Sequence, residues 1–208
     1  GLNYKTDKGY LQLLCFTLSA LAIIDTLNEN SLEDHIFPLV SSKNVTLILQ
    51  RADIYNGKAG TGNLAMFYAI SLIYAKKYLN RDVDDLIKKW INKHLNSMNS
   101  NGFWGPYDRN YYLQFQNGYH QYEIYEYLGI QSKSLNQMID FVSSLSDKQG
   151  HFAPYPGGGG CYDYDAIFLL TFLGKISSNK YVPLFKKTIG SILSEQNIDG
   201  GFSESLYI

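Results

Sequence analysis

The stretch WINKHLNSMNSNGFWG, residues 90–105, decides the fold because the chain repeats its pattern twice. The other copies are MIDFVSSLSDKQGHFAP, residues 138–154, and TIGSILSEQNIDGGFSE, residues 188–204. Each copy reads as an amphipathic helix that ends in polar residues, followed by glycine and an aromatic residue. The period of roughly fifty residues is typical of helical repeat proteins. The key glycines of the three copies are Gly102, Gly150 and Gly201.

A second set of segments lies between these copies, and each segment follows a loop that contains glycine. These segments are residues 60–79, 117–129 and 159–174, and residues 8–27 fit the same role. Strict alternation of apolar and polar residues, the signal of strands, is nearly absent. The sequence therefore predicts one all-α domain over residues 1–208. Its four helical hairpins are expected at about 10–50, 62–98, 117–146 and 162–196.

Some parts of this prediction depart from a regular repeat. Pro38 and residues 41–44 are expected to split the outer helix of the first hairpin. The connectors 101–116 and 149–160 are longer than most links between helices. Because long ordered loops often carry binding and catalytic residues, we expect the functional site near them.

Charge and cysteine content narrow the function classes. The chain has 18 basic and 19 acidic residues with no long run of one sign, so nucleic acid is not an expected partner. Two cysteines are too few for a disulfide framework and favour a reducing, cytoplasmic location. The apolar run of residues 10–24 could be read as a signal peptide, but polar residues interrupt it and a core helix is favoured. The run is also too short to span a membrane.

Aromatic residues are abundant, with 18 tyrosines and 11 phenylalanines. Rings with polar tips suit a pocket that binds sugars or stabilises cations. For any single ring, a place in the hydrophobic core is the simpler interpretation.

The repeat endings resemble those of the α/α-toroid repeats of terpenoid cyclases and protein prenyltransferase β-subunits. The residues that carry the resemblance are Gln196–Phe202, Asn101–Trp104 and Gln149–Phe152, and it covers about residues 60–204. It implies alternating inner and outer helices around a cavity, with an isoprenoid as the small-molecule substrate. Toroids also serve polysaccharide lyases, epimerases and glycosidases, so a saccharide substrate or a non-catalytic binding domain are the alternatives. Four hairpins imply an open toroid or part of a larger protein.

The string DVDD, residues 82–85, matches the acid motif D-x-D-D of those cyclases. Neighbouring carboxylates can share a proton, which makes one of them an acid. In this chain, however, the string begins an outer helix. We therefore expect Asp82 or Asn80 to cap that helix, and Asp84 and Asp85 to lie in its first turn.

The string CYDYDA, residues 161–166, lies where the resemblance places catalytic residues, at the start of an inner helix. Asp163 and Asp165 are candidate catalytic acids, although the third carboxylate of the family motif is missing. Two residues apart on a helix, they point in different directions, so only one can face a cavity. The alternative is structural, with Asp163 as the cap of the helix and Asp165 in its first turn.

Two other kinds of site are not expected. Cys161 resembles the zinc-binding cysteine of prenyltransferases, but Gly159 stands where their aspartate would be, so no metal site is predicted. The glycines at 57–62 and 157–160 lack the lysine spacing of a Walker loop and follow no strand, so no nucleotide cofactor is predicted.

His120 completes the candidate catalytic set. It aligns with Asp165 when the endings Leu128-Gly129 and Leu173-Gly174 are superposed, and it is expected to open its inner helix. A histidine and a tyrosine there could act as base and acid in a carbohydrate-active enzyme, whereas a lone histidine is more often structural. The expected substrate-binding residues are Tyr119, Tyr122, Glu123, Tyr162, Tyr164 and Trp104.

Overall fold

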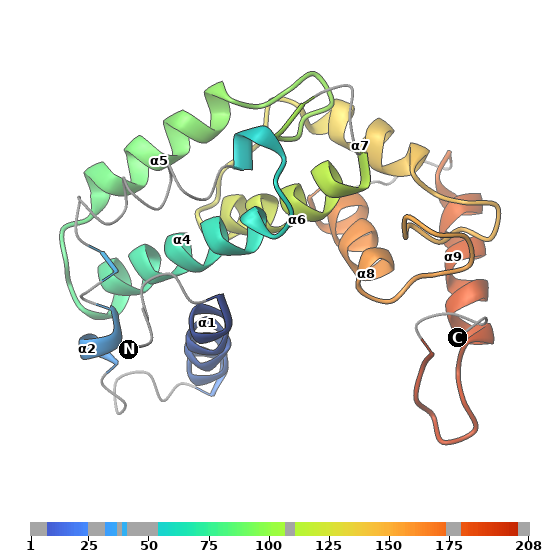
Figure 1. Ribbon diagram of the computed structural model, residues 1–208, viewed down its shortest axis with the longest axis horizontal. Coiled ribbons are helices and arrows are strands. Elements are labelled where there is room, and N and C mark those ends of the chain that lie inside the picture. Colours follow the sequence, from blue (N-terminus) through green and yellow to red (C-terminus); the bar gives the residue numbers. More distant parts are fainter. Residues whose placement is uncertain are drawn as a thin grey trace. The chain divides into compact units, whose positions relative to one another are not determined.

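The structure is a computed structural model that describes residues 8–24, 32–36, 39–40, 54–106, 111–173 and 180–203. Within these ranges the chain forms helices and no strand (Figure 1). An antiparallel bridge joins Gln196 and Phe202 in the loop after the last helix. The all-α prediction is confirmed for the described part of the chain.

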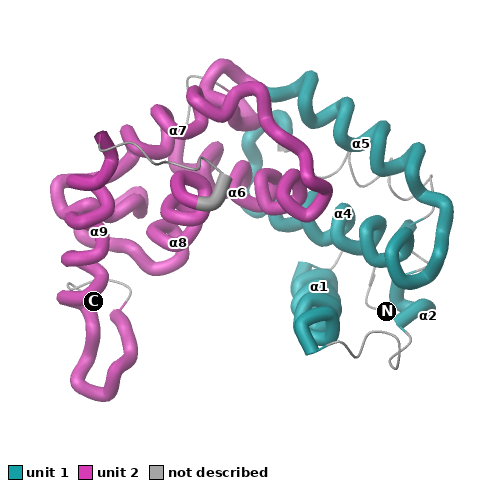
Figure 2. Tube along the Cα trace, turned by 180° about the vertical axis from the view of Figure 1, so that it is seen from behind, with its two compact units in different colours: residues 1–98 teal, residues 99–208 magenta. Residues whose placement is uncertain are grey.

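The chain divides into two compact units, residues 1–98 and 99–208 (Figure 2). The boundary falls between the second and third predicted hairpins. The single repeat domain and the closure of its hairpins into a toroid stay predictions.

In the first unit, helices α1 and α5 each pack against α4. Helix α4 buries residues on several of its sides, whereas α5 buries one stripe formed by Ile87, Trp90 and His94. That difference is the one expected between an inner and an outer helix. The helical elements of this unit are α1 (Lys8–Ile23), α2 (Glu33–Ile36), η1 (Ile54–Asn56), α4 (Thr61–Tyr78) and α5 (Asp84–Asn96).

The predicted bounds of α1, α4 and α5 hold to within a few residues. Of the predicted outer helix of the first hairpin, the structure describes the short α2. Pro38 and residues 41–53 lie outside the described residues. Helix α1 buries Leu11, Leu14 and Leu18, as expected for a core helix. Across the described ranges, no helix has both the length and the apolar character needed to cross a membrane.

The DVDD string, residues 82–85, was expected to supply a cap and two first-turn carboxylates to α5, and only the second expectation holds. Asp84 and Asp85 lie in the first turn of α5, as predicted, and Asp84 pairs with Lys76 at 2.6 Å. The prediction that Asp82 or Asn80 caps the helix is wrong, because the N-cap position is Val83 and no side chain caps it. The first-turn carboxylates satisfy the helix dipole instead.

In the second unit, α6 packs against α8 and η2, and α7 packs against η2. The segment η2 continues α8 with π-helical geometry. The helical elements of this unit are α6 (Tyr111–Tyr127), α7 (Leu135–Ser144), α8 (Cys161–Ile167), η2 (Phe168–Leu173) and α9 (Val182–Ser194).

Helix α6 begins at Tyr111, six residues before the predicted start. The sequence placed residues 111–116 in the connector, but they lie inside the helix, as do Asn117 and Gly118. A Cβ atom at Gly118 would overlap the buried ring of Phe103. Gly118 therefore serves the close approach of a ring to the helix rather than a turn. The prediction that His120 opens this helix is consequently wrong.

The three repeat endings share one backbone turn. The N–H groups of Asn99, Asp147 and Asn197 donate to the carbonyls four residues later, and their carbonyls accept from the glycine three residues later. Those glycines are Gly102, Gly150 and Gly200, with φ of 80°, 93° and 85°. The third key glycine is thus Gly200 and not Gly201 as predicted, because Gly200 has the left-handed conformation.

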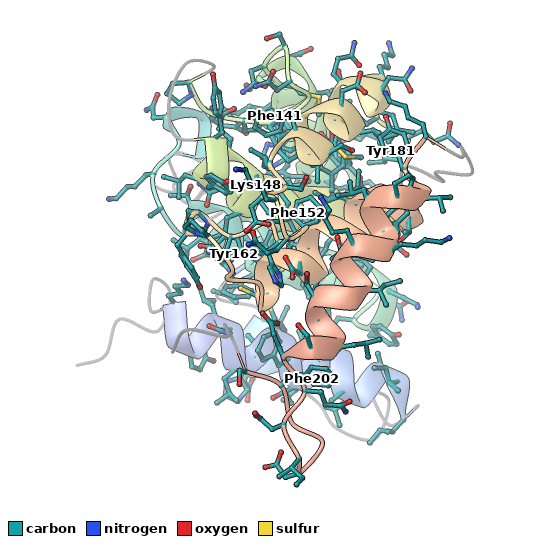
Figure 3. All side chains as sticks on the ribbon, turned by 90° about the vertical axis from the view of Figure 1, so that its right-hand side faces the viewer. Phe141, Lys148, Phe152, Tyr162, Tyr181 and Phe202 are labelled. Carbon is teal, nitrogen blue, oxygen red and sulfur yellow. The ribbon has the colours of Figure 1, made fainter. Side chains whose placement is uncertain are left out.

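The aromatic residue two positions after each glycine has a different environment in each copy. Trp104 and Phe152 are fully buried, and Trp104 contacts the rings of Tyr122 and Tyr125 in α6. Phe202, in the loop after α9, is 53% exposed (Figure 3). The first two aromatics therefore fill the core between helices, as the repeat predicts.

Candidate functional site

The short helix α8 carries both candidate aspartates, and neither caps it. The N-cap position is Gly160, with no side-chain hydrogen bond. Asp163 lies in the first turn and Asp165 in the second, so the structural alternative drawn from the sequence is wrong for both residues. The expectation that the two carboxyls point in different directions is confirmed by their neighbours: Asp163 contacts His151 and Phe152 in the connector, whereas Asp165 lies near Glu123 in α6.

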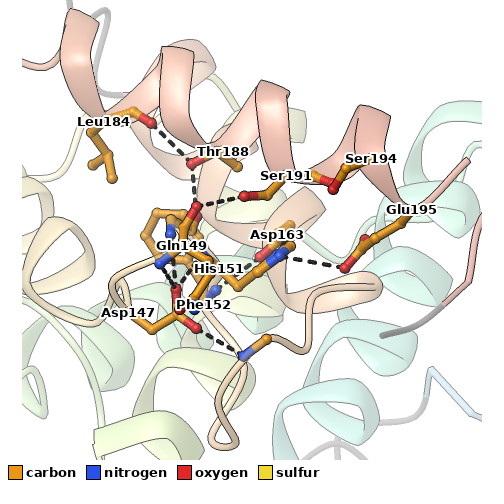
Figure 4. Close-up of polar contacts among 12 residues, drawn as sticks. Asp147, Gln149, His151, Phe152, Asp163, Leu184, Thr188, Ser191, Ser194 and Glu195 are labelled. Carbon is orange, nitrogen blue, oxygen red and sulfur yellow. Dashed lines mark hydrogen bonds and ion pairs between the residues drawn. The ribbon is translucent and has the colours of Figure 1, made fainter. Parts of the chain in front are cut away.

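Asp163 faces the connector and α9. Its Oδ1 atom accepts the N–H of Phe152 at 2.8 Å, and its Oδ2 atom lies 2.7 Å from Nδ1 of His151 (Figure 4). The other ring nitrogen of His151, Nε2, lies 3.3 Å from Oε1 of Glu195 at the end of α9. This second pair is close enough for ion pairing but is not aligned as a hydrogen bond. We call His151, Asp163 and Glu195 the His151 clamp.

All three side chains of the His151 clamp are at least 95% buried. Burial raises the pKa of Asp163, while hydrogen bonding to His151 and Phe152 opposes the rise. Burial also raises the pKa of Glu195, and proximity to His151 opposes it. Because buried charges are stable only when paired, the clamp depends on all three members.

The four glycines before α8 are required for two reasons, their backbone conformation and the lack of space for a side chain. Gly157 and Gly160 have positive φ, which side chains other than glycine rarely adopt. At Gly158 a Cβ atom would overlap the ring of Tyr155, and at Gly159 it would overlap the Asp163 carboxylate. The glycines therefore serve close packing and a tight path of the chain.

Asp147 organises the connector that carries His151. Its Oδ1 atom accepts the N–H groups of Gln149, Gly150 and His151, and its Oδ2 atom accepts the N–H of Gly157 at 2.9 Å. Burial opposes ionisation, but these four hydrogen bonds hold the pKa of Asp147 below its usual value. A single carboxylate thus joins both ends of the loop from 147 to 157.

A second polar group lies on α6. Glu123 accepts a hydrogen bond at 3.0 Å from the hydroxyl of Tyr119, one turn earlier, and its Oε2 atom lies 3.2 Å from Nδ1 of His120. The side chains of His120 and Glu123 are 17% and 18% exposed, so both can reach solvent. Burial, and then the charges of Glu123 and Asp165, raise the pKa of Tyr119. The phenol therefore stays protonated and donates to Glu123.

Asp165 faces this group from α8. It is 6% exposed, and its carboxyl has no hydrogen-bond partner within the described residues. Burial, and then the nearby charge of Glu123, raise the pKa of Asp165 to about 8. Asp165 is therefore mainly a neutral carboxylic acid at neutral pH, beside a carboxylate that accepts hydrogen bonds.

Aromatic rings border these groups. The Tyr119 ring lies 6.2 Å from that of Tyr164 and 5.4 Å from that of Phe168, measured between centroids. Tyr164 is 64% exposed and stacks loosely on Phe168, with an interplanar angle of 26°. We call Tyr119, His120, Glu123, Tyr164, Asp165 and Phe168 the Glu123 cluster.

The other predicted substrate contacts lie elsewhere in the unit. Trp104 and Tyr122 are core residues, and the Tyr122 hydroxyl donates to the Gly102 carbonyl at 2.7 Å. Tyr162 is half-buried, with its ring 6.4 Å from that of Phe115. Their roles in binding stay predictions. The structure thus brings Tyr119, Glu123 and Tyr164 together with His120 and Asp165, and separates Asp163 from them.

The sequence did not point to His151 or Glu195. One signal was available, because His151 occupies the position of the buried Phe103 in the repeat, directly after the key glycine. A polar ring at a buried position requires hydrogen-bond partners. Glu195 lies 44 residues further along the chain, and its approach to His151 depends on how α9 packs.

The two cysteines are free thiols, Cys15 buried and Cys161 exposed. Within the described ranges no three His, Cys, Asp or Glu side chains are grouped so as to hold a metal ion. Both ring nitrogens of His151 face carboxylates, so the His151 clamp offers no vacant nitrogen for a metal.

No protein-family model matches the chain, and no curated protein or solved structure matches it either. The resemblance to α/α-toroid enzymes therefore stays a prediction.

Proposed function

We propose that the protein is an acid–base enzyme that acts on a saccharide at the Glu123 cluster. The observation that carries the proposal is the pairing of two carboxyls in unlike environments. Asp165 is buried without a hydrogen-bond partner among the described residues, and Glu123 accepts from Tyr119 and His120. Such a pair supplies a proton donor and a proton acceptor at the same pH.

The roles follow from the two environments. The neutral carboxyl of Asp165 donates its proton to the leaving oxygen of a glycosidic bond as that bond breaks. Glu123 contacts the Tyr119 hydroxyl and the His120 ring, and in the proposed reaction it removes a proton from the attacking water. The water oxygen bonds to the anomeric carbon and keeps its other proton, while the bond from that carbon to the leaving oxygen breaks. The leaving oxygen then carries the proton from Asp165, and Glu123 holds the proton taken from water.

The surroundings of the two carboxyls favour a saccharide. His120, Glu123 and Tyr119 offer polar groups beside rings, which is the usual composition of a sugar-binding site. The exposed ring of Tyr164 can stack on the apolar face of a sugar. A diphosphate fits less well, because the carboxylate of Glu123 would repel its charge.

A second candidate, protonation of an isoprenoid alkene, is favoured by one observation. The proton donor Asp165 lies beside Tyr119, whose ring contacts Phe168 and Tyr164. Aromatic faces stabilise the carbocation that such a protonation would form.

A binding and turnover screen tests the proposal. Neutral oligosaccharides, uronic-acid oligosaccharides and isoprenyl diphosphates are added to the wild type and to Asp165→Asn, Glu123→Gln and Tyr164→Ala. Matched controls are Asp140→Asn, an exposed carboxylate on α7, and Tyr111→Ala, an exposed ring that packs on Phe141. We expect a saccharide to bind and be cleaved, with turnover reduced about 100-fold or more in Asp165→Asn and unchanged in the controls.

Tyr164→Ala should weaken saccharide binding about tenfold, because it removes the stacking surface. Turnover of an isoprenoid alone would favour the second candidate. Equal binding and turnover by all variants would remove the Glu123 cluster from the function.

A further inference from the structure

The orientation of α8 decides where Asp165 points, and the helix itself does little to fix that orientation. It is seven residues long, has no side-chain cap at its N-terminus and passes directly into the π-helical η2. A helix this short is marginal without tertiary contacts. Tertiary contacts must therefore set its rotation: α8 and η2 pack on α6, and the first turn of α8 adds directional polar contacts.

Those contacts converge on Asp163. Both of its carboxylate oxygens are occupied, one by the backbone of Phe152 and one by the ring of His151. His151 is in turn held against Glu195, the residue that caps the C-terminal end of α9. The His151 clamp thus ties α8 to the connector and to the end of α9 (Figure 4).

Steric fit adds to the polar contacts. Gly159 presses its backbone against the Asp163 carboxylate and the His151 ring, with no room for a Cβ atom. The Asp163 carboxylate is therefore held in place by Phe152, His151 and Gly159.

Asp163 and Asp165 are two residues apart, and each residue of a helix turns by about 100°. Their side chains thus lie on nearly opposite sides of α8, one toward the connector and α9 and the other toward α6. A fixed Asp163 determines the direction of Asp165.

We propose that His151, Asp163 and Glu195 are positioning residues, which fix the rotation of α8 so that Asp165 is held beside Glu123 and Tyr119. The role assigned to Asp165 rests on the proposed function. None of the three belongs to the Glu123 cluster, so the proposal assigns them no contact with a substrate.

The titration of Asp165 tests this proposal, since its environment changes if α8 rotates. The full chain is labelled with 13C at the aspartate carboxyls, and the Asp165 signal is assigned by its loss in Asp165→Asn. Its titration is then followed in the wild type, in Asp163→Asn and in Glu195→Gln. The acidic groups that face the Asp165 side are Glu123 and Tyr119, and neither is changed.

The matched control is Thr188→Val on α9. Thr188 is buried and donates to the Gly150 carbonyl at 2.7 Å, so it ties the same connector to the same helix without a charge. The control is expected to lower the melting temperature and to leave the pKa of Asp165 where it is.

In Asp163→Asn and Glu195→Gln we expect the Asp165 titration to move toward ordinary aspartate values by about one pH unit or more, as the carboxyl gains solvent. An unchanged titration in a folded Glu195→Gln, the milder of the two substitutions, would overturn the proposal. An equal shift in Thr188→Val would also overturn it, because the effect would then be general loosening. The titration needs no substrate. A saccharide screen that finds no ligand would therefore contradict the proposed function and leave the test of the positioning role unaffected.

Discussion

At the scale of single residues, Gly159 has the least tolerance for change. A methyl group there would overlap the Asp163 carboxylate, which is backbone-bound and cannot move aside. We expect Gly159→Ala to reduce the free energy of unfolding by roughly 2 kcal/mol or more. Urea unfolding at pH 7 measures this change.

Gly190→Ala is the control for that substitution. Gly190 lies in α9, is exposed and has open space where a Cβ atom would be. Alanine should therefore stabilise the protein by about 0.5–1 kcal/mol, through the lower backbone entropy of the unfolded chain. If Gly159→Ala stabilises the protein as Gly190→Ala does, the packing at Gly159 is looser than described.

At the scale of elements, Asp147 performs two separable tasks. Its Oδ1 atom organises the turn from 147 to 151, as Asn99 does for its own turn, and its Oδ2 atom binds the N–H of Gly157. Asp147→Asn can keep the first task but not the second, since an amide nitrogen cannot accept. We expect Asp147→Asn to cost about 1–2 kcal/mol and Asp147→Ala to cost more.

Hydrogen exchange at the Gly157 amide measures the second task directly and should accelerate in both variants. The penalty of Asp147→Asn should also disappear in acid. The lowered pKa of Asp147 means that its contribution is present above the unfolded-state pKa and is lost as pH falls through the folded-state value. Equal stability of the Asn and Ala variants would contradict the division into two tasks.

Helix α6 provides another test, because the sequence predicted its start six residues too late and Gly118 lies inside it. Gly118→Ala should cost about 1–3 kcal/mol by overpacking, because the ring of Phe103 is buried and has no space to retreat. Thermal unfolding beside Gly190→Ala checks this. If Gly118→Ala stabilises the protein as Gly190→Ala is expected to, the glycine serves no packing role.

At the scale of the whole molecule, stability should fall between about pH 5 and pH 8 because of Asp165. Its pKa of about 8 in the folded chain lies above the ordinary 3.8, so the folded state keeps a proton that the unfolded state has lost. This contribution is fully present below the unfolded-state pKa and is lost as pH rises through the folded-state value. Asp165→Asn stays neutral throughout, so its stability relative to the wild type should rise by roughly 2–4 kcal/mol from pH 5 to pH 8.

Urea unfolding of both proteins at the two pH values gives this difference. Asp163 and Glu195 also have raised pKa values, but they are present in both proteins and cancel in the comparison. A difference that stays constant with pH would contradict the neutral state of Asp165.

The parts of this molecule that the sequence predicts are those with local causes. The helices and the turns at Gly102 and Gly150 follow from periodicity and from the backbone freedom of glycine, both visible in a short window. The opposite directions of Asp163 and Asp165 follow from helical geometry alone. Tyr119, Glu123 and His120 could be grouped because they lie within one turn or so of each other.

The remaining features depend on tertiary packing. Gly118 looks like a loop residue until Phe103, fifteen positions earlier, is known to lie against it. The pairing of His151 with Glu195 requires the position of α9, which no local pattern contains. The closure of the repeats into a toroid is a prediction of the same long-range kind.

The central claim is that Asp165 is a neutral acid beside a carboxylate in the Glu123 cluster. Direct titration of the Asp165 carboxyl by 13C NMR in the wild-type chain tests it most simply. The account predicts a midpoint of about 8, which moves down in Glu123→Gln as the nearby negative charge is removed. A midpoint near the ordinary 3.8, unaffected by Glu123→Gln, would contradict it.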